Sequence, residues 1–203
     1  MRSGSRSPAQ LKDIVGPSDT RTMDLSGVAA RRWTRLLART GVEVRQFAQA
    51  LGGRREHPGD LLIVGVPGFE PWHFTAHLGE QASRHGRRDL VPTLLRWQIP
   101  EGAPAHLAVP VDSLLTVSRH QTVLAIDPFG GDPELLDRID HAHRRGARIL
   151  SLHRGQPELV DLSHETLWVD RRRPDQEFEV TQHLVTDLSP VPVHRGLPRP
   201  AGV

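Results

Sequence analysis

The sequence contains no cysteine and no tyrosine, and Lys12 is its single lysine. The absence of cysteine excludes disulfides, thiolate metal ligands and cysteine nucleophiles, and we expect a cytoplasmic location. No run of 18 or more apolar residues is present, so we expect no membrane-spanning helix and no membrane partner.

The charges of the chain nearly balance, because it has 26 lysine and arginine residues and 24 aspartate and glutamate residues. Almost all of the basic residues are arginine, a bias that we attribute to a GC-rich genome rather than to function. A formal net charge of +2 gives little attraction for a polyanion, so we do not expect a nucleic-acid partner.

One folded domain between two tails is the organisation that the sequence predicts. Residues 1–22 are rich in Ser, Arg, Gly and Pro and show no apolar periodicity, which predicts a disordered basic tail. Residues 189–203 are rich in proline and predict a second, extended tail. The intervening residues 23–188 are enough for one α/β domain with a buried core.

Segments typical of strands and helices alternate between the tails. Apolar residues at helical spacing predict a long N-terminal helix that ends at Gly52 and Gly53. Short apolar runs predict strands at 60–66, 90–97, 122–128, 147–153 and 165–170. Helices are predicted between and after them, at 71–86, 132–146, 158–163 and 175–189. This alternation predicts an α/β fold with three αβα layers and a parallel sheet of about five strands.

Two glycine-containing loops follow predicted strands, at the edge of the sheet where ligands bind in such folds. Each loop leads into a helix whose free N–H groups and dipole favour an anion. The predicted ligand-binding residues are Gly65, Gly68 and Phe69 in the first loop and Gly130, Gly131 and Asp132 in the second.

These loops and their helices resemble the sugar isomerase (SIS) domain family, over residues 25–188. In phosphoheptose isomerases, the members that the chain resembles most, the first loop reads Gly-Asn-Gly-Gly-Ser and precedes His-Phe-x-x-Glu. Here residues 65–69 read GVPGF and residues 73–77 read HFTAH. The second family loop reads Ser-Gly-Asn-Ser, and residues 129–132 read FGGD. The resemblance implies an SIS-like fold of flavodoxin-like topology, a homo-oligomer (dimer or tetramer) and a sugar or sugar-phosphate ligand.

The loops depart from the family where it binds phosphate through hydroxyl groups. Phe69 stands in place of the serine of the first loop, and Phe129 and Asp132 stand in place of the two serines of the second. A carboxylate at Asp132, with Asp127 nearby, would repel a phosphate by about 4 kcal/mol per charge pair at 4 Å and an effective dielectric of 20. We therefore do not expect phosphate binding in the family's manner. A turn capped by Asp132, with Pro133 at the first helical position, explains the same residues without a ligand.

His73 and His77 are four residues apart on a predicted helix, so both rings face one side. This spacing suits a shared metal ion. The resemblance places a His and a Glu at these two positions, where some family members hold zinc. If the last helix faces the same cavity, Asp187 and either Glu179 or His183 are predicted further ligands. The alternative is chance, because the chain has 12 histidines and a histidine pair without a longer motif is a weak signal.

Glu179, His183 and Asp187 recur every four residues in the last predicted helix and form a polar stripe. If the protein is an enzyme, Glu179 or His183 is the predicted proton-transfer base near a sugar carbonyl. A solvated helix face is the alternative interpretation of the same stripe.

A divergent SIS-domain protein is the function that the sequence favours, by a narrow margin. The loss of the loop hydroxyl groups indicates a non-catalytic module for carbohydrate-derivative binding or for regulation. The alternative is a phosphosugar isomerase of the aldose–ketose type, dependent on a divalent metal such as zinc if the histidines hold one.

Overall fold

The computed structural model describes residues 41–169 and 178–190. The predicted N-terminal tail, the first part of the predicted long helix and all but two residues of the predicted C-terminal tail lie outside these residues. Residues 41–51 are helical, as predicted for the end of the long helix, and are called the N-terminal helix below.

Five parallel strands form the sheet, in the order β2-β1-β3-β4-β5. They are β1 (Leu61–Gly65), β2 (Thr93–Leu94), β3 (Thr122–Asp127), β4 (Arg148–His153) and β5 (Glu165–Trp168). The register aligns Gly65 with Ile126 and Asp127 with His153, so the carboxyl ends of the three central strands lie together. The predicted parallel sheet and its flavodoxin-like strand order are confirmed.

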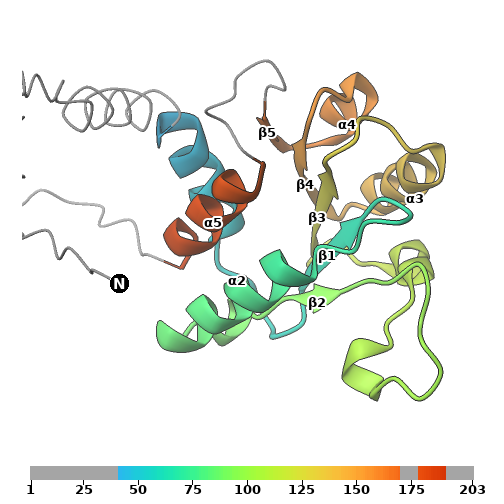
Figure 1. Cartoon of the computed structure of the whole chain (residues 1–203), viewed down its shortest axis with the longest axis horizontal. Coiled ribbons are helices and arrows are strands. Elements are labelled where there is room, and N and C mark those ends of the chain that lie inside the picture. The colour runs from blue at the N-terminus through green and yellow to red at the C-terminus, as the bar shows by residue number, and fades with distance from the viewer. Residues whose placement is uncertain (1–40, 170–177, 191–203) are drawn as a thin grey trace, which may run out of the picture.

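Helices cover both faces of this sheet (Figure 1). They are α2 (Trp72–Arg84), α3 (Pro133–Arg144), α4 (Pro157–Leu162) and α5 (Phe178–Leu188). Three 3-10 helices lie between α2 and β3, and these are η1 (Arg88–Leu90), η2 (Ala105–Leu107) and η3 (Val111–Thr116). Within residues 41–169 and 178–190, every helix is too short or too polar to cross a bilayer.

Alternation along the strands divides the core into two layers. Leu61 and Ile63 of β1 pack with the N-terminal helix, α2 and α5, whereas Leu62 and Val64 pack with α3, α4 and η3. Because helices cover both faces, every residue of β1 and of β3 is buried. This burial explains why these strands read as continuous apolar runs in the sequence. The predicted three-layer αβα architecture is confirmed.

β2 is shorter than the sequence predicted. The strand expected over 90–97 is confined to Thr93–Leu94, because Leu90 belongs to η1 and Pro92 has no N–H to donate to a neighbouring strand. C-terminal to β2 the chain diverges from β1, and Arg96 pairs with Pro110 instead. The other four strands begin and end within two residues of their predicted bounds.

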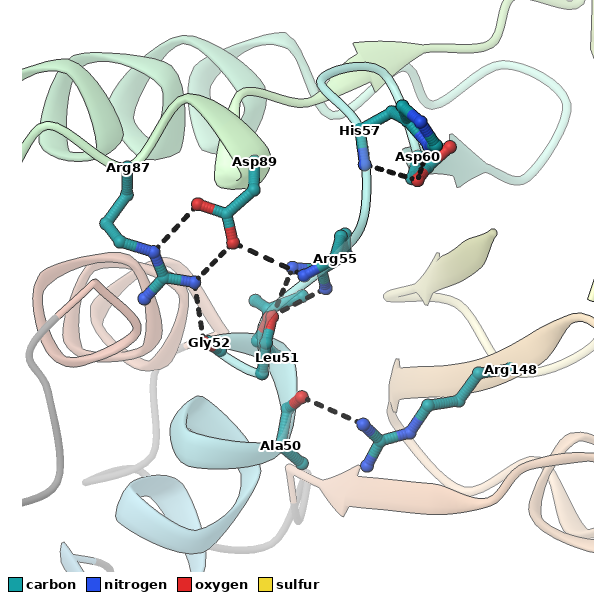
Figure 2. A network of polar contacts seen from close by, with 10 residues as sticks. Ala50, Leu51, Gly52, Arg55, His57, Asp60, Arg87, Asp89 and Arg148 are labelled. Carbon is teal, nitrogen blue, oxygen red and sulfur yellow. Dashed lines mark hydrogen bonds and ion pairs between the residues drawn. The ribbon is translucent and has the colours of Figure 1, made fainter. Parts of the chain in front are cut away.

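Arginine side chains close the carboxyl end of the N-terminal helix (Figure 2). Arg55 donates hydrogen bonds to the carbonyl oxygens of Leu51 at 2.7 Å and Gly53 at 2.9 Å. Arg87 donates to the carbonyl oxygen of Gly52 at 2.9 Å. The last carbonyls of a helix lack partners within the helix and carry its negative dipole end, so guanidinium groups stabilise them by both effects. Burial lowers the pKa of Arg55 to about 10, which leaves it charged at neutral pH.

Gly52 lies against the chain at the end of α5. A Cβ at this position would overlap the carbonyl oxygen of Ser189, so only glycine permits the contact. The close approach joins the N-terminal helix to α5 on one face of the sheet, and α5 in turn forms a wall of the pocket described below.

Asp89 holds Arg87 in this network (Figure 2). Its carboxylate accepts hydrogen bonds from Arg87 at 2.9 and 2.8 Å and from the backbone N–H of Arg55 at 3.4 Å. The bonds from Arg87 lower the pKa of Asp89 from its ordinary 3.8 to about 2. The carboxylate therefore stabilises the fold above about pH 4, and this contribution is lost as the pH falls through about 2.

We predict that Asp89→Asn lowers the free energy of unfolding by about 2 kcal/mol at pH 7. The difference from the parent protein should shrink by about 1 kcal/mol at pH 3, because the unfolded carboxyl is then mostly protonated. Urea denaturation followed by circular dichroism at pH 7, 4 and 3 measures both effects. Asp112→Asn is the control, because Asp112 pairs with Arg138 while 64% exposed and should change stability by less than about 0.5 kcal/mol. A pH-independent difference for Asp89→Asn would contradict the assigned pKa.

Candidate functional site

A hollow of about 650 Å³ lies at the carboxyl ends of the central strands. Its walls come from the β1–α2 loop, the β3–α3 loop, the residue after β4, and the first turns of α2 and α5. We call it the carboxyl-end pocket and define it by six of its lining residues, Phe69, His73, Phe129, Arg154, Phe178 and Glu179. It lies at the sheet edge where the sequence predicted ligand binding.

The β1–α2 loop is a tight turn that directs Phe69 inward. A Cβ at Gly65 would overlap the carbonyl oxygen of Phe69, and Gly68 has a φ of +82°. The N–H of Phe69 donates to the carbonyl oxygen of Val66 at 2.9 Å, which closes the turn. Gly65 and Gly68 are therefore required by the turn itself, and of the three predicted residues in this loop Phe69 lines the pocket.

The β3–α3 loop is bonded to a carboxylate of the chain itself. Asp127, the last residue of β3, is 1% exposed. Its two oxygens accept hydrogen bonds from the N–H groups of Phe129 at 2.9 Å, Gly130 at 2.8 Å and Gly131 at 2.7 Å. These are the amides that a bound anion would need in this loop, so the position of such an anion is taken by Asp127.

Asp132 has the helix-capping role that the sequence offered as its interpretation without a ligand. Its side chain accepts a hydrogen bond from the N–H of Leu135 at 2.9 Å and caps α3, with Pro133 at the first helical position. The expectation that a carboxylate fills the loop holds for Asp127 and not for Asp132. The signal available in the sequence was an aspartate at the end of a buried strand, two residues before a Gly-Gly loop.

His153 organises the next loop in the same way, from the end of β4. Its Nδ1 accepts hydrogen bonds from the N–H groups of Gly155 at 3.2 Å and Gln156 at 2.9 Å, and its Nε2 lies 2.8 Å from Oγ1 of Thr166. Burial lowers the pKa of His153, and the negative charge of Asp127 offsets only part of this effect. An Nδ1 that accepts two bonds requires the neutral ring with its proton on Nε2, so Thr166 accepts.

We predict that Asp127→Ala lowers the free energy of unfolding by about 3 kcal/mol, because three amides lose a charged acceptor. Asp132→Ala should cost about 1 kcal/mol, the usual loss for one helix cap. Urea denaturation at pH 7 compares the two variants directly. Equal losses would show that the three bonds to Asp127 add nothing beyond an ordinary cap.

Three histidine side chains meet beside the pocket, two from α2 and one from α5. Nε2 of His73 lies 3.1 Å from Nε2 of His183. One nitrogen from each of His73, His77 and His183 lies within 4.8 Å of the others. Nδ1 of His77 is buried and has no hydrogen-bond partner among the described residues. The sequence predicted the pair on α2 and named His183 among the possible further ligands, and the structure brings these three residues together in what we call the histidine cluster.

Asp187, another predicted metal ligand, is not a member of the histidine cluster. Its carboxylate accepts a hydrogen bond from Nε2 of Gln81 at 2.6 Å, further along the contact between α2 and α5. The two helices are thus joined by a polar pair at one point and by the histidines at another.

Glu179 and His183, the predicted catalytic pair, lie one turn apart on α5 but have different surroundings. Glu179 is exposed and lines the carboxyl-end pocket. His183 is half-buried in the histidine cluster. Of the cluster, His73 also lines the pocket, so the histidines and the pocket share a boundary at the start of α2.

Arg154 is a pocket residue that sequence analysis did not single out. It directly follows β4, and its Cζ lies 5.3 Å from the ring centre of Phe178. Its Nε is buried without a hydrogen-bond partner among the described residues, and none of their carboxylates forms an ion pair with it. The available signal was a basic residue at the end of a third buried strand, which is a ligand-facing position in parallel sheets.

Comparison with solved structures identifies the fold of the chain. No family model and no curated protein matches the sequence. The structure is similar to the sugar isomerase domain of the RpiR transcription factor from Sphaerobacter thermophilus, with a TM-score of 0.50 and 14% identity over 81% of this chain and 89% of that chain. It is also similar to Vibrio vulnificus NanR, solved with ManNAc-6P, with a TM-score of 0.49 and 19% identity over 81% of this chain and 60% of that chain. The chain has the sugar isomerase fold, as its sequence predicted.

Proposed function

We propose that the chain is a divergent SIS-domain protein that binds a carbohydrate derivative in the carboxyl-end pocket, as a binding or regulatory module rather than an isomerase. The observation that carries this proposal is the carboxylate of Asp127, bonded to all three loop amides. A regulatory role agrees with the likeness to the sugar isomerase domain of a transcription factor. The homo-oligomer and the cytoplasmic location expected from the sequence belong to the same proposal.

A phosphate group has no binding site of the family's kind in this loop. It would need the amides that Asp127 already uses, and it would meet that carboxylate as a like charge. At about 4 Å and an effective dielectric of 20, the repulsion is about 4 kcal/mol for each pair of unit charges. Phe69 and Phe129 offer no hydroxyl groups in compensation. A ligand of this pocket therefore binds through contacts other than a phosphate in the β3–α3 loop.

The alternative function is an aldose–ketose isomerase of sugar phosphates. Such a reaction needs a base that moves the proton between neighbouring carbons of the sugar. Glu179 is the side chain with the better access, because it is exposed on the pocket wall whereas His183 is hydrogen-bonded to His73. This alternative still requires a phosphate site that does not depend on the loop amides.

We predict that the protein binds a carbohydrate without exchanging its protons with solvent. Thermal shift and calorimetry with neutral sugars, sugar phosphates, sugar acids and inorganic phosphate measure binding. Proton NMR of the same sugars in D₂O measures exchange at the carbon next to the carbonyl. We expect binding of at least one carbohydrate, no stabilisation by inorganic phosphate, and no deuterium incorporation. Deuterium incorporation that disappears in Glu179→Gln would establish the isomerase alternative, and a failure of every carbohydrate to bind would refute the main proposal.

We also propose that the histidine cluster binds a divalent transition metal such as zinc. Zinc–nitrogen bonds of about 2.0–2.1 Å place neighbouring ligand nitrogens roughly 3.3 Å apart. The 3.1 Å separation between His73 and His183 is close to this value, and the third nitrogen needs only a small movement. The unpartnered Nδ1 of His77 is a buried acceptor of the kind that a missing ligand leaves.

His73, His77 and His183 would hold the ion, and a zinc ion bound there would supply Lewis acidity. The three ligands come from two helices, because His73 and His77 belong to α2 and His183 belongs to α5. An ion shared by all three joins the two helices. Asp187 is not needed as a ligand in this arrangement, since it is bonded to Gln81.

We predict that the untagged protein, dialysed against zinc and then against buffer, retains about one equivalent of zinc by elemental analysis. Its melting temperature should rise on loading, because the ion binds the folded chain. His77→Ala and His183→Ala should abolish both effects, whereas His106→Ala, an exposed residue of η2, should preserve them. Less than about 0.1 equivalent of zinc in the parent protein would refute the site, and retention in both cluster variants would refute the assigned ligands.

A further inference from the structure

Arg154 is a cation in the carboxyl-end pocket that the described residues leave without an anion. Arg96, by contrast, does not line this pocket, and it donates to both oxygens of Glu70, a pocket residue, and pairs with it at 2.8 Å. Arg154 is half-buried, with Nε buried and unbonded, and its guanidinium lies over the ring of Phe178. A partly buried charge with an unsatisfied donor costs free energy unless an anion pairs with it. Its place at the pocket wall makes a ligand the natural source of that anion.

The charges around Arg154 favour a ligand group with one negative charge over a group with two. Glu179 lines the same pocket, and Asp127 lies beneath the neighbouring loop. A phosphate dianion would meet these carboxylates with one guanidinium to balance them. A carboxylate carries half that charge, and its two oxygens match the two parallel N–H groups of a guanidinium.

The rest of the pocket suits a polyhydroxylated body attached to that carboxylate. Glu179, Gln182 and His73 line the pocket and supply acceptors and donors for hydroxyl groups. Phe69 and Phe129 meet edge to face with ring centres 5.9 Å apart, and Phe129 is 62% exposed. Aromatic faces of this kind pack against the C–H face of a sugar.

We propose that Arg154 is a specificity-determining residue that binds the carboxylate of a sugar acid, so that the ligand class of this pocket is an aldonate or uronate rather than a sugar phosphate. The inference rests on the proposed function, since it assigns the anionic group of the carbohydrate derivative that the pocket binds. In this arrangement the guanidinium at the end of β4, next to the β3–α3 loop, binds the anionic group in place of the loop amides. The two aromatic side chains that stand in place of loop serines then belong to the ligand's apolar contacts.

Calorimetry with gluconate, glucuronate and galacturonate, set against glucose and glucose 6-phosphate, tests the ligand class. We expect at least one sugar acid to bind about tenfold or more tightly than glucose and than glucose 6-phosphate. Arg154→Gln should weaken that binding by about tenfold or more. Arg154→Lys should bind with an affinity between those of the parent and Arg154→Gln, because lysine keeps the positive charge but lacks the two parallel N–H groups of a guanidinium. Arg84→Gln, an exposed residue of α2 paired with Glu80, is the matched control and should bind as the parent does. Unchanged circular dichroism and melting temperature establish that the variants fold.

A second measurement does not depend on the identity of the sugar. The ¹⁵N resonance of the Arg154 Nε–H, assigned by its loss in Arg154→Gln, is followed during titration with acetate and with inorganic phosphate. We expect acetate to shift it and phosphate to shift it less at equal concentration. A sugar acid that binds Arg154→Gln as tightly as the parent, or a resonance that acetate leaves unmoved, overturns the inference. If no carbohydrate binds while acetate shifts the resonance, the proposed function fails and the anion site at Arg154 stands.

Discussion

The hydrogen bonds from three successive amides to the carboxylate of Asp127 determine both the shape and the chemistry of the pocket. A carboxylate that is 1% exposed is tolerated because three N–H groups, at 2.7 to 2.9 Å, satisfy its oxygens. The same bonds fix the path of the β3–α3 loop, which carries Phe129 into the pocket wall. A loop held in this way cannot offer these three amides to a phosphate, so in this sugar isomerase fold the amides of the β3–α3 loop are occupied by the chain's own carboxylate.

The neighbouring strand, β4, also ends in a side chain that accepts hydrogen bonds from the loop after it, but this acceptor is neutral. His153 is aligned with Asp127 in the sheet and binds the amides of the β4–α4 loop through Nδ1. Each of these strands therefore ends in a side chain that folds the loop after it, and the two loops meet at one edge of the sheet. Arg154 follows His153 directly, and because the loop is fixed on His153 the guanidinium is held at the pocket rather than left free in solvent.

The sequence predicted those parts of the fold that depend on local patterns, and it left open or missed those that depend on which elements meet. Largely apolar runs predicted β1, β3 and β4 because strands covered on both faces bury all, or all but one, of their residues. Spacing on one helix predicted His73 and His77 as a pair. His183 was one of several possible further ligands in the last helix, and its selection over Glu179 and Asp187 depends on how α2 packs on α5. The role of Asp127 depends on how a loop turns back over its own strand. Neither arrangement has a repeat in the sequence that could reveal it.

The first turns of α5 connect the separate parts of this site. Phe178 lies under the guanidinium of Arg154, Glu179 lines the pocket, and His183 faces the two histidines of α2. Asp187 and Gln81 join the same two helices further along, and Gly52 admits the end of α5 against the N-terminal helix. The position of α5 is thus set by its contacts with α2 and with the N-terminal helix. Any ligand that contacts Arg154 and Glu179 lies between a loop fixed by Asp127 and His153 and a helix fixed by these contacts, so the pocket walls are ordered before a ligand arrives.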